Sequence, residues 1–204
     1  MLQLGWLEHD GERYAIGSRL FEMASLTRLR MQLRECALPF LEDLYEATHE
    51  TVHLAVLDEL AVLYLEKISG HGGGASDLTR VGGRMPAYCT GVGKVLLAFT
   101  RPEVTEAAAA AGLAARTPAT VTDPARLAEV LATVRESGVA FDREECAIGL
   151  ACVAAPVFAP DGDCLAALSV TGPARTLPVD RLAPAARAAG LGISRALRDL
   201  VRVH

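Results

Sequence analysis

The chain has 204 residues, of which 51% are hydrophobic and 22% are charged, a balance typical of a folded protein with a full core. No stretch approaches the roughly 20 apolar residues that span a bilayer, no signal peptide is recognisable, and the net charge of −5 gives no overall attraction to nucleic acid. Five cysteines, an odd number at uneven spacings, indicate reduced thiols in a cytoplasmic protein rather than a disulfide framework.

The first seventeen residues predict the end of a helix followed by a small hairpin. Residues 2–7 carry the apolar side chains of a helix end, and LEHDGERYAI then places Asp10-Gly11, a two-residue turn signal, between two short β-prone segments. A two-stranded hairpin is marginal in water on its own. The residues leave two interpretations open, a frayed terminal hairpin on the main domain or a piece of a larger unit.

A basic helical segment follows Gly17-Ser18. Apolar side chains from Leu20 to Leu29 recur at helical spacing, and Pro39 is expected to mark a kink or the start of a second helix. The basic side chains are those of Arg19, Arg28, Arg30 and Arg34. A solvated helix face is the simpler explanation for these arginines, and contact with DNA is the alternative.

The centre of the chain predicts a hairpin, a flexible loop and a helix. TVHLAVLDELAVLYLEKI alternates in polarity, with Asp58-Glu59 at its turn, and a glycine-rich loop follows it. CTGVGKVLLAF then indicates a helix that Thr90 caps. Its glycines and lysine suggest a phosphate-binding loop, but Tyr88 stands in place of the leading glycine and Val95 in place of the hydroxyl. A nucleotide is therefore not predicted, whereas a small anion at the helix start is.

Two helices are predicted in the segment after Phe99. Thr100 and Glu103 have the spacing of a capping box at the start of an alanine-rich helix. Asp123 predicts the start of the next helix, and Gly138 predicts its end.

The last third predicts a second hairpin and a final helix. IGLACVAAPVF and CLAALSVTGP are β-prone runs on either side of Asp161-Gly162, a strong turn signal, and the helix is expected from about Val179 to Val201. The order of helix, hairpin, helices, hairpin and helix predicts an α+β fold with helices packed against an antiparallel sheet.

Candidates for a binding site gather on this second hairpin. Ser169 and Thr171 are two residues apart on one strand, so their hydroxyls share a face, and Cys152 lies on the strand paired with it. Together with the helix start at Thr90, they predict a small polar pocket. A solvated turn is the simpler interpretation of the acids in FDREEC, although Asp142 follows an apolar pair and is the one expected to be buried.

Catalysis and metal binding have less support. A cysteine nucleophile needs a base, usually a histidine, and His204 is the only histidine in this half of the chain. A metal site of Cys146, Cys152 and His71 stays open, but no C-x-x-C or H-x-x-x-H spacing favours it. We therefore predict a binding protein that is not an enzyme and that needs no cofactor or metal.

Four long motifs carry a resemblance to a known family. In chain order they are GWLEHDGERYAIGSRLFEMA, PFLEDLYEATHETVHLAVLD, MPAYCTGVGKVLLAF and FDREECAIGLACVAAPVFAPDGDCLAALSVTGP. The chain resembles the IclR family of bacterial transcriptional regulators over essentially all of its length.

The resemblance implies a domain organisation. Residues 1–17 correspond to the remnant of a winged helix-turn-helix with its wing hairpin, residues 18–34 to a linker helix, and residues 35–204 to a GAF-like effector-binding domain. The earlier helices of the DNA-reading unit are absent from the sequence as given, so we expect no reading of a major groove by these residues.

The resemblance also implies a function. Such a regulator senses a small metabolite, a carboxylate or an aromatic acid, and controls operator DNA as a homodimer or tetramer. The pocket positions carried over from the family are Met85, Tyr88, Gly91, Val92, Asp142, Leu150, Cys152, Ser169 and Thr171. The helix start at CTGVGK then forms the lip of the pocket, and Lys94 is expected to be structural or paired with an acid. One alternative is a freestanding GAF-like module that binds a small molecule or a metal and has no DNA target.

Overall fold

The computed structural model describes residues 4, 6–9, 11–19, 28–69 and 78–202. By their internal contacts the residues form two compact units, 1–35 and 36–204. Helix α2, Arg28–Thr48, spans the boundary between them and contains Pro39, which therefore does not start a second helix. The predicted apolar face from Leu20 to Leu29 lies outside the residues whose side chains are described.

The first unit contains the predicted hairpin. Strand β1, Leu7–His9, pairs antiparallel with β2, Tyr14–Ile16, and the amide of Gly17 donates to the carbonyl of Trp6 at 2.8 Å. His9 pairs with Tyr14, so four residues separate the strands and the predicted two-residue turn is wrong. Asp10 and most of the predicted helix end lie outside the described residues.

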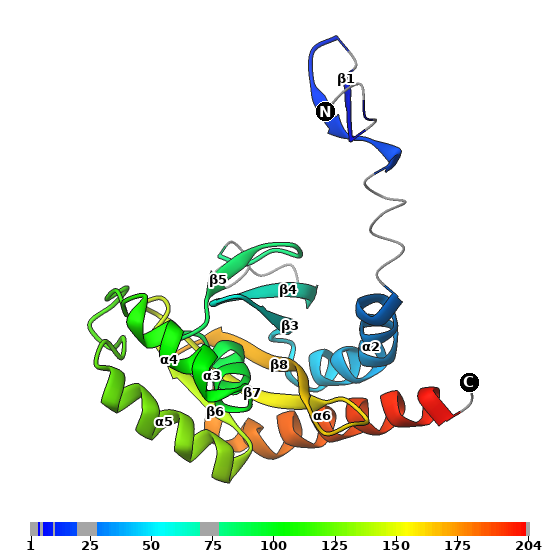
Figure 1. The fold of residues 1–204 in the computed structure, drawn as a ribbon. Coiled ribbons are helices and arrows are strands. Elements are labelled where there is room, and N and C mark those ends of the chain that lie inside the picture. The colour runs from blue at the N-terminus through cyan, green and yellow to red at the C-terminus, as the bar shows by residue number, and fades with distance from the viewer. Residues whose placement is uncertain (1–3, 5, 10, 20–27, 70–77, 203–204) are drawn as a thin grey trace. The chain divides into compact units, whose positions relative to one another are not determined.

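The second unit is built on one six-stranded antiparallel sheet in the order β5-β4-β3-β8-β7-β6 (Figure 1). The strands are β3 Thr51–Asp58, β4 Ala61–Ile68, β5 Arg84–Pro86, β6 Ala140–Arg143, β7 Leu150–Phe158 and β8 Cys164–Pro173. Both predicted hairpins, β3–β4 and β7–β8, are confirmed. Asp58 pairs with Ala61, so the first turn is Glu59-Leu60, one residue later than predicted.

Helices cover both faces of the sheet. They are α3 Gly91–Ala98, α4 Pro102–Ala110, α5 Pro124–Ser137 and α6 Val179–Arg202. Gly91 of α3 packs against Cys152 and Ala154 of β7, whereas Gly190 of α6 packs against Ala155 and the Pro156 carbonyl, on the opposite face (Figure 1). Because both faces are covered, residues 151–157 of β7 are all buried.

The predicted start of α5 is confirmed, whereas the predicted start of α4 is wrong. The Asp123 carboxylate accepts from the amide of Arg126 at 2.8 Å, and Gly138 ends α5 in the left-handed conformation at φ 70°, so both α5 signals are confirmed. The capping box is wrong, because α4 starts after Arg101, which makes no side-chain cap, and Pro102 occupies the first turn.

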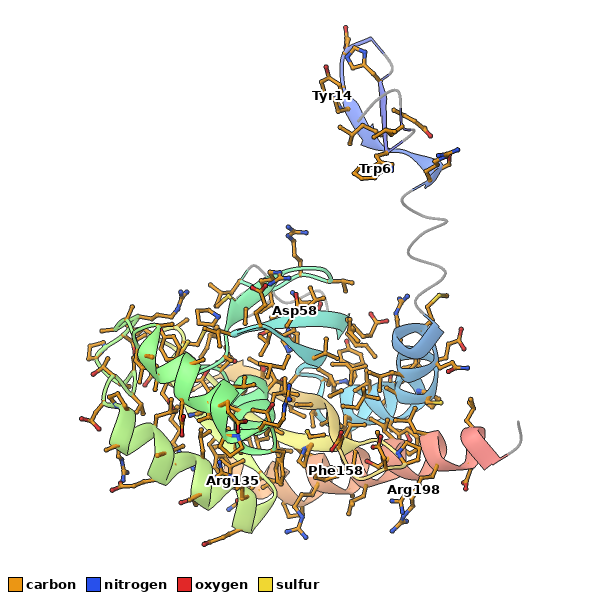
Figure 2. All side chains as sticks on the ribbon, in the orientation of Figure 1. Trp6, Tyr14, Asp58, Arg135, Phe158 and Arg198 are labelled. Carbon is orange, nitrogen blue, oxygen red and sulfur yellow. The ribbon has the colours of Figure 1, made fainter. Side chains whose placement is uncertain are left out.

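The helices on the α3 face are tied to one another and to the sheet. Phe99, after α3, stacks edge to face on Phe158 of β7 with ring centroids 5.3 Å apart, and Arg135 of α5 donates to the Ala98 carbonyl (Figure 2). These contacts fix α3 over β7 and β8, and with it the helix start that the sequence singled out. None of the described helices is long and apolar enough to cross a membrane.

Candidate functional site

A cavity lies where the N-terminus of α3 meets the sheet. Eight of the nine predicted pocket residues line it: Met85, Gly91, Val92, Asp142, Leu150, Cys152, Ser169 and Thr171. Thr90 and Cys146, which the sequence also singled out, are in its wall, together with His53, Tyr64, Leu78 and Thr79, which it did not. The ninth predicted residue, Tyr88, is outside the lining, and its hydroxyl donates to the Ala114 carbonyl at 2.6 Å.

The start of α3 is fixed by local chemistry. The Thr90 hydroxyl accepts from the amide of Gly93 at 3.1 Å, as the sequence predicts, and donates to the Pro86 carbonyl at 3.2 Å. The amide of Gly91 donates to the Cys152 thiol, and Val92 is the next residue of the first turn. Amides in a first helical turn have no partner within the helix, so this end of α3 is suited to an anionic group.

Strand pairing brings a histidine into the cavity. His53 of β3 lies opposite Ser169 of β8, with its Nδ1 3.5 Å from the serine hydroxyl and its Nε2 2.8 Å from the Thr79 hydroxyl. His53 is 2% exposed, and the centroid of its ring lies 5.0 Å from the centroid of the Tyr64 ring. Burial, with a smaller effect of Lys67, lowers the pKa of His53 to about 3, so the ring is neutral and serves as a donor and acceptor.

Asp142 is a buried strand residue and not part of a solvated turn. It belongs to β6, pairs with Cys152, and is 6% exposed because α3 covers this edge of the sheet. Its Oδ1 accepts from the amides of Glu145 at 2.7 Å and Cys146 at 3.4 Å. Burial nevertheless raises the pKa of Asp142 to about 6, so the carboxyl can take a proton near neutral pH and become a donor.

Lys94 is not available to a ligand. It is 2% exposed, and its ammonium pairs with Oε1 of Glu145, which confirms the expectation of an acidic partner. The other oxygen, Oε2, is buried without a hydrogen-bond partner among the described residues. The charge of Lys94 is thus neutralised by Glu145, so this lysine cannot serve as the cation of a phosphate-binding loop.

The cavity thiol of Cys152 is suited to packing. Cys152 lies opposite Thr171 in the β7–β8 ladder, as predicted from the hairpin, and burial raises its pKa to about 12. Such a thiol behaves as a small apolar group and not as a nucleophile. Within the described residues, no cluster of three metal-ligating side chains is found, and the His71 of the metal hypothesis lies outside those residues.

The arrangement favours a small oxygen-bearing ligand. The cavity has a volume of about 440 Å³ including the open space at its mouth. Residues with hydroxyl groups, a neutral histidine and the first turn of α3 line it, and its described lining contains no lysine or arginine. Charge on a ligand must therefore be met by hydrogen-bond donors and by the helix dipole.

The fold and cavity define a class of α+β domains in which a helix N-terminus faces a polar cavity in an antiparallel sheet. The sequence matches the family model for the bacterial transcriptional regulator IclR C-terminal domain over residues 25–195. It is 35% identical over 185 residues to the HTH-type transcriptional regulator KdgR of Escherichia coli (strain K12), covering 89% of this chain and 70% of that protein. It is 34% identical over 191 residues to the transcriptional repressor IclR of the same organism, covering 89% of this chain and 68% of that protein.

A solved structure agrees with these relatives. The crystal structure of an IclR homologue from Microbacterium hydrocarbonoxydans, complexed with 4-hydroxybenzoate, superposes with a TM-score of 0.90 at 34% identity, covering 98% of this chain and 82% of that one. The chain belongs to the IclR family of bacterial transcriptional regulators. The resemblance drawn from the four motifs and the α+β fold are thereby confirmed.

Proposed function

We propose that the second unit senses a small carboxylate or aromatic acid in the cavity at the start of α3, and that its occupancy controls transcription. The observation that carries the proposal is the meeting of eight predicted pocket residues around the first turn of one helix. The Microbacterium homologue, complexed with 4-hydroxybenzoate, supports an aromatic acid as the first ligand to test.

A carboxylate has matching donors in the cavity. The Val92 amide and the α3 dipole favour a negative charge at the helix start, while the hydroxyls of Ser169 and Thr171 lie on the neighbouring strand. Asp142, with its pKa near 6, supplies a further donor once it is protonated. Met85 and Leu150 give the cavity apolar walls for the rest of the ligand.

The remaining parts of the proposal concern the whole regulator. Residues 1–17 correspond to the wing of a winged helix-turn-helix, residues 18–34 to a linker helix, and residues 35–204 to the sensing domain. Operator DNA is contacted through that helix-turn-helix, in a homodimer or tetramer. A ligand with different affinities for two subunit arrangements shifts the population between them, and this changes the spacing of the DNA-binding heads.

Thermal unfolding with 4-hydroxybenzoate tests the sensor. A ligand at a hundredfold its dissociation constant adds about 2.7 kcal/mol of stability, which raises the melting temperature by about 5 to 10 °C in a chain of this length. We expect this shift with 4-hydroxybenzoate or acetate and a smaller one with the uncharged 4-hydroxybenzamide. The shift should disappear in Ser169→Ala and persist in Ser137→Ala, whose hydroxyl bonds backbone carbonyls at the end of α5.

Two results contradict the proposal. Equal shifts for the wild type and Ser169→Ala place the ligand elsewhere on the chain. Equal shifts in melting temperature for 4-hydroxybenzoate and 4-hydroxybenzamide mean that the carboxylate is not recognised, because a helix dipole favours the charged compound over the neutral one.

A further inference from the structure

A second groove lies at the opposite end of α3 from the cavity. The first turn of α3 lines the cavity, whereas the groove includes Phe99, the residue that follows the last turn. The end of α5 and residues of α6 complete it, and Arg135 and Phe158, both part of its lining, are labelled in Figure 2. Its volume is about 630 Å³ including the open space at its mouth, which is in the range of small-molecule sites. The two described linings have no residue in common, so the groove is separate from the effector proposal.

Part of the groove wall is aromatic and aliphatic. Phe99 and Phe158 are half-buried, and their rings stack edge to face with an interplanar angle of 88°. Pro156 is buried in the same lining, and Leu191 of α6 is 44% exposed. An exposed leucine beside two partly exposed rings leaves apolar surface that the flat face of an aromatic ligand can cover.

Two arginines, Arg135 of α5 and Arg187 of α6, belong to the same lining. Arg135 donates from Nε to the Ala98 carbonyl at the end of α3, and Arg187 donates from Nη1 to the Ser137 carbonyl at the end of α5, at 3.3 Å. Because a guanidinium has five N–H donors, each bond positions the group and leaves further donors for a ligand. Both arginines are exposed, and within the described part of the chain neither forms an ion pair with an acid.

The charges of the groove favour an anion. Its described lining contains the two arginines and one acid, Glu136, whereas the lining of the cavity contains no arginine or lysine. A carboxylate can accept two parallel hydrogen bonds from a guanidinium, and such charge-assisted bonds are stronger than neutral ones. A purely structural role, in which the arginines cap the ends of two helices, accounts for one donor of each arginine. It does not account for the exposed apolar surface beside them.

We propose that this groove is a second ligand site, which binds an aromatic carboxylate of two fused rings. Arg135 and Arg187 bind the carboxylate, and the rings lie against Phe99, Phe158 and Leu191. The ligand is larger than a single benzoate ring because three apolar side chains from two separate segments and α6 contribute to the surface that it covers. The proposal concerns the groove alone and does not depend on the effector of the cavity.

Isothermal titration calorimetry of the full chain with 2-naphthoate tests the site. The titration is made in the Ser169→Ala chain, so that binding in the cavity does not contribute to the heat. We expect saturable binding, and at least about tenfold weaker binding of the uncharged 2-naphthamide, because the amide lacks the charge that the guanidinium groups recognise. Adding Arg135→Gln or Arg187→Gln should weaken the binding of 2-naphthoate by at least about tenfold for the same reason.

Two further variants check that the effect is specific to the groove. Arg126→Gln removes an exposed arginine of α5 that is not part of the lining, and it should leave the affinity for 2-naphthoate within about twofold. Glu136→Gln removes the acid of the lining and should bind 2-naphthoate more tightly.

Three results overturn the proposal: no saturable binding of 2-naphthoate, equal affinity for 2-naphthoate and 2-naphthamide, or arginine variants that bind as tightly as their parent. If Arg135→Gln loosens the end of α3, Arg187→Gln and the comparison of acid with amide still decide the question. The failure of this proposal leaves the effector proposal intact, because that one is decided by the response of 4-hydroxybenzoate to Ser169→Ala.

Discussion

Replacing Lys94 by methionine is expected to destabilise the domain strongly. The substitution keeps an unbranched apolar stem in α3 but removes the ammonium, which is 2% exposed and pairs with Glu145. The Glu145 side chain is 12% exposed, and its Oε2 has no partner among the described residues, so the variant leaves a nearly buried carboxylate without a counter-charge. Breaking one side of a buried pair costs about 3 to 5 kcal/mol.

Urea unfolding followed by circular dichroism measures this cost. In a chain of this length each kcal/mol lowers the melting temperature by about 2 to 4 °C, so a fall of about 6 to 20 °C accompanies the change in the urea midpoint. The double variant Lys94→Met/Glu145→Leu removes both charges and should recover most of the loss, because well-packed apolar residues replace a buried pair at little cost.

A surface pair provides the control. On α5, Nη1 of Arg126 lies 2.7 Å from Oε2 of Glu129, and both side chains are 66% exposed. Arg126→Met should therefore lower the free energy of unfolding by no more than about 0.5 kcal/mol. The reasoning fails if the free energy of unfolding of Lys94→Met is within about 1 kcal/mol of the wild-type value. It also fails if the double variant is less stable than Lys94→Met alone, since the cost then lies in packing and not in an unpaired charge.

Three further predictions concern the cavity and its neighbouring helix. Gly91→Ala places a methyl group against the Cys152 sulfur, so its melting temperature should fall by an amount equivalent to about 1 to 3 kcal/mol, and adding Cys152→Ala should restore most of it; no rescue rejects the steric account. Because the pKa of Asp142 rises from 3.8 to about 6 on folding, its stabilising contribution is present below about pH 4 and is lost as the pH rises through 6. The unfolding free energy of the wild type relative to Asp142→Asn should therefore fall by about 2.4 kcal/mol between pH 4 and pH 7, and a flat difference contradicts the assignment. Asp123→Ala removes the cap on the Arg126 amide and should cost about 1 kcal/mol in urea unfolding, whereas an unchanged midpoint means that the cap contributes nothing.

Local chemistry explains which elements the sequence predicted well. Asp123 and Gly138 bound α5 because a cap and a left-handed stop are properties of a few adjacent residues. The same holds for the β7–β8 hairpin, where Gly162 adopts a φ of 98°. The capping box failed at Glu103 because its helix starts one residue later, after Arg101, and Pro102 already supplies a rigid first turn.

The cavity was predictable only in part because strand pairing is not a local property. The nine pocket positions came from family motifs, and eight of them line the cavity. His53 was missed because it meets Ser169 only through the pairing of β3 with β8, across 116 residues of sequence. Asp142 belongs to β6, a strand of four residues, which is too short to give an alternating pattern, so its burial depends on the neighbouring β7 and on α3.

The two thiols that line the cavity, those of Cys146 and Cys152, show why residue type alone does not determine chemistry. Cys152 receives backbone N–H bonds from Gly91 and Asp142, yet burial dominates and raises its pKa to about 12. Cys146 is similarly buried, but the nearby Cys89 side chain and, to a smaller extent, the Arg116 guanidinium lower its pKa, so it moves the opposite way. Because Cys89 comes from a segment 57 residues earlier in the sequence, only the folded arrangement makes the pKa of Cys146 differ from that of Cys152.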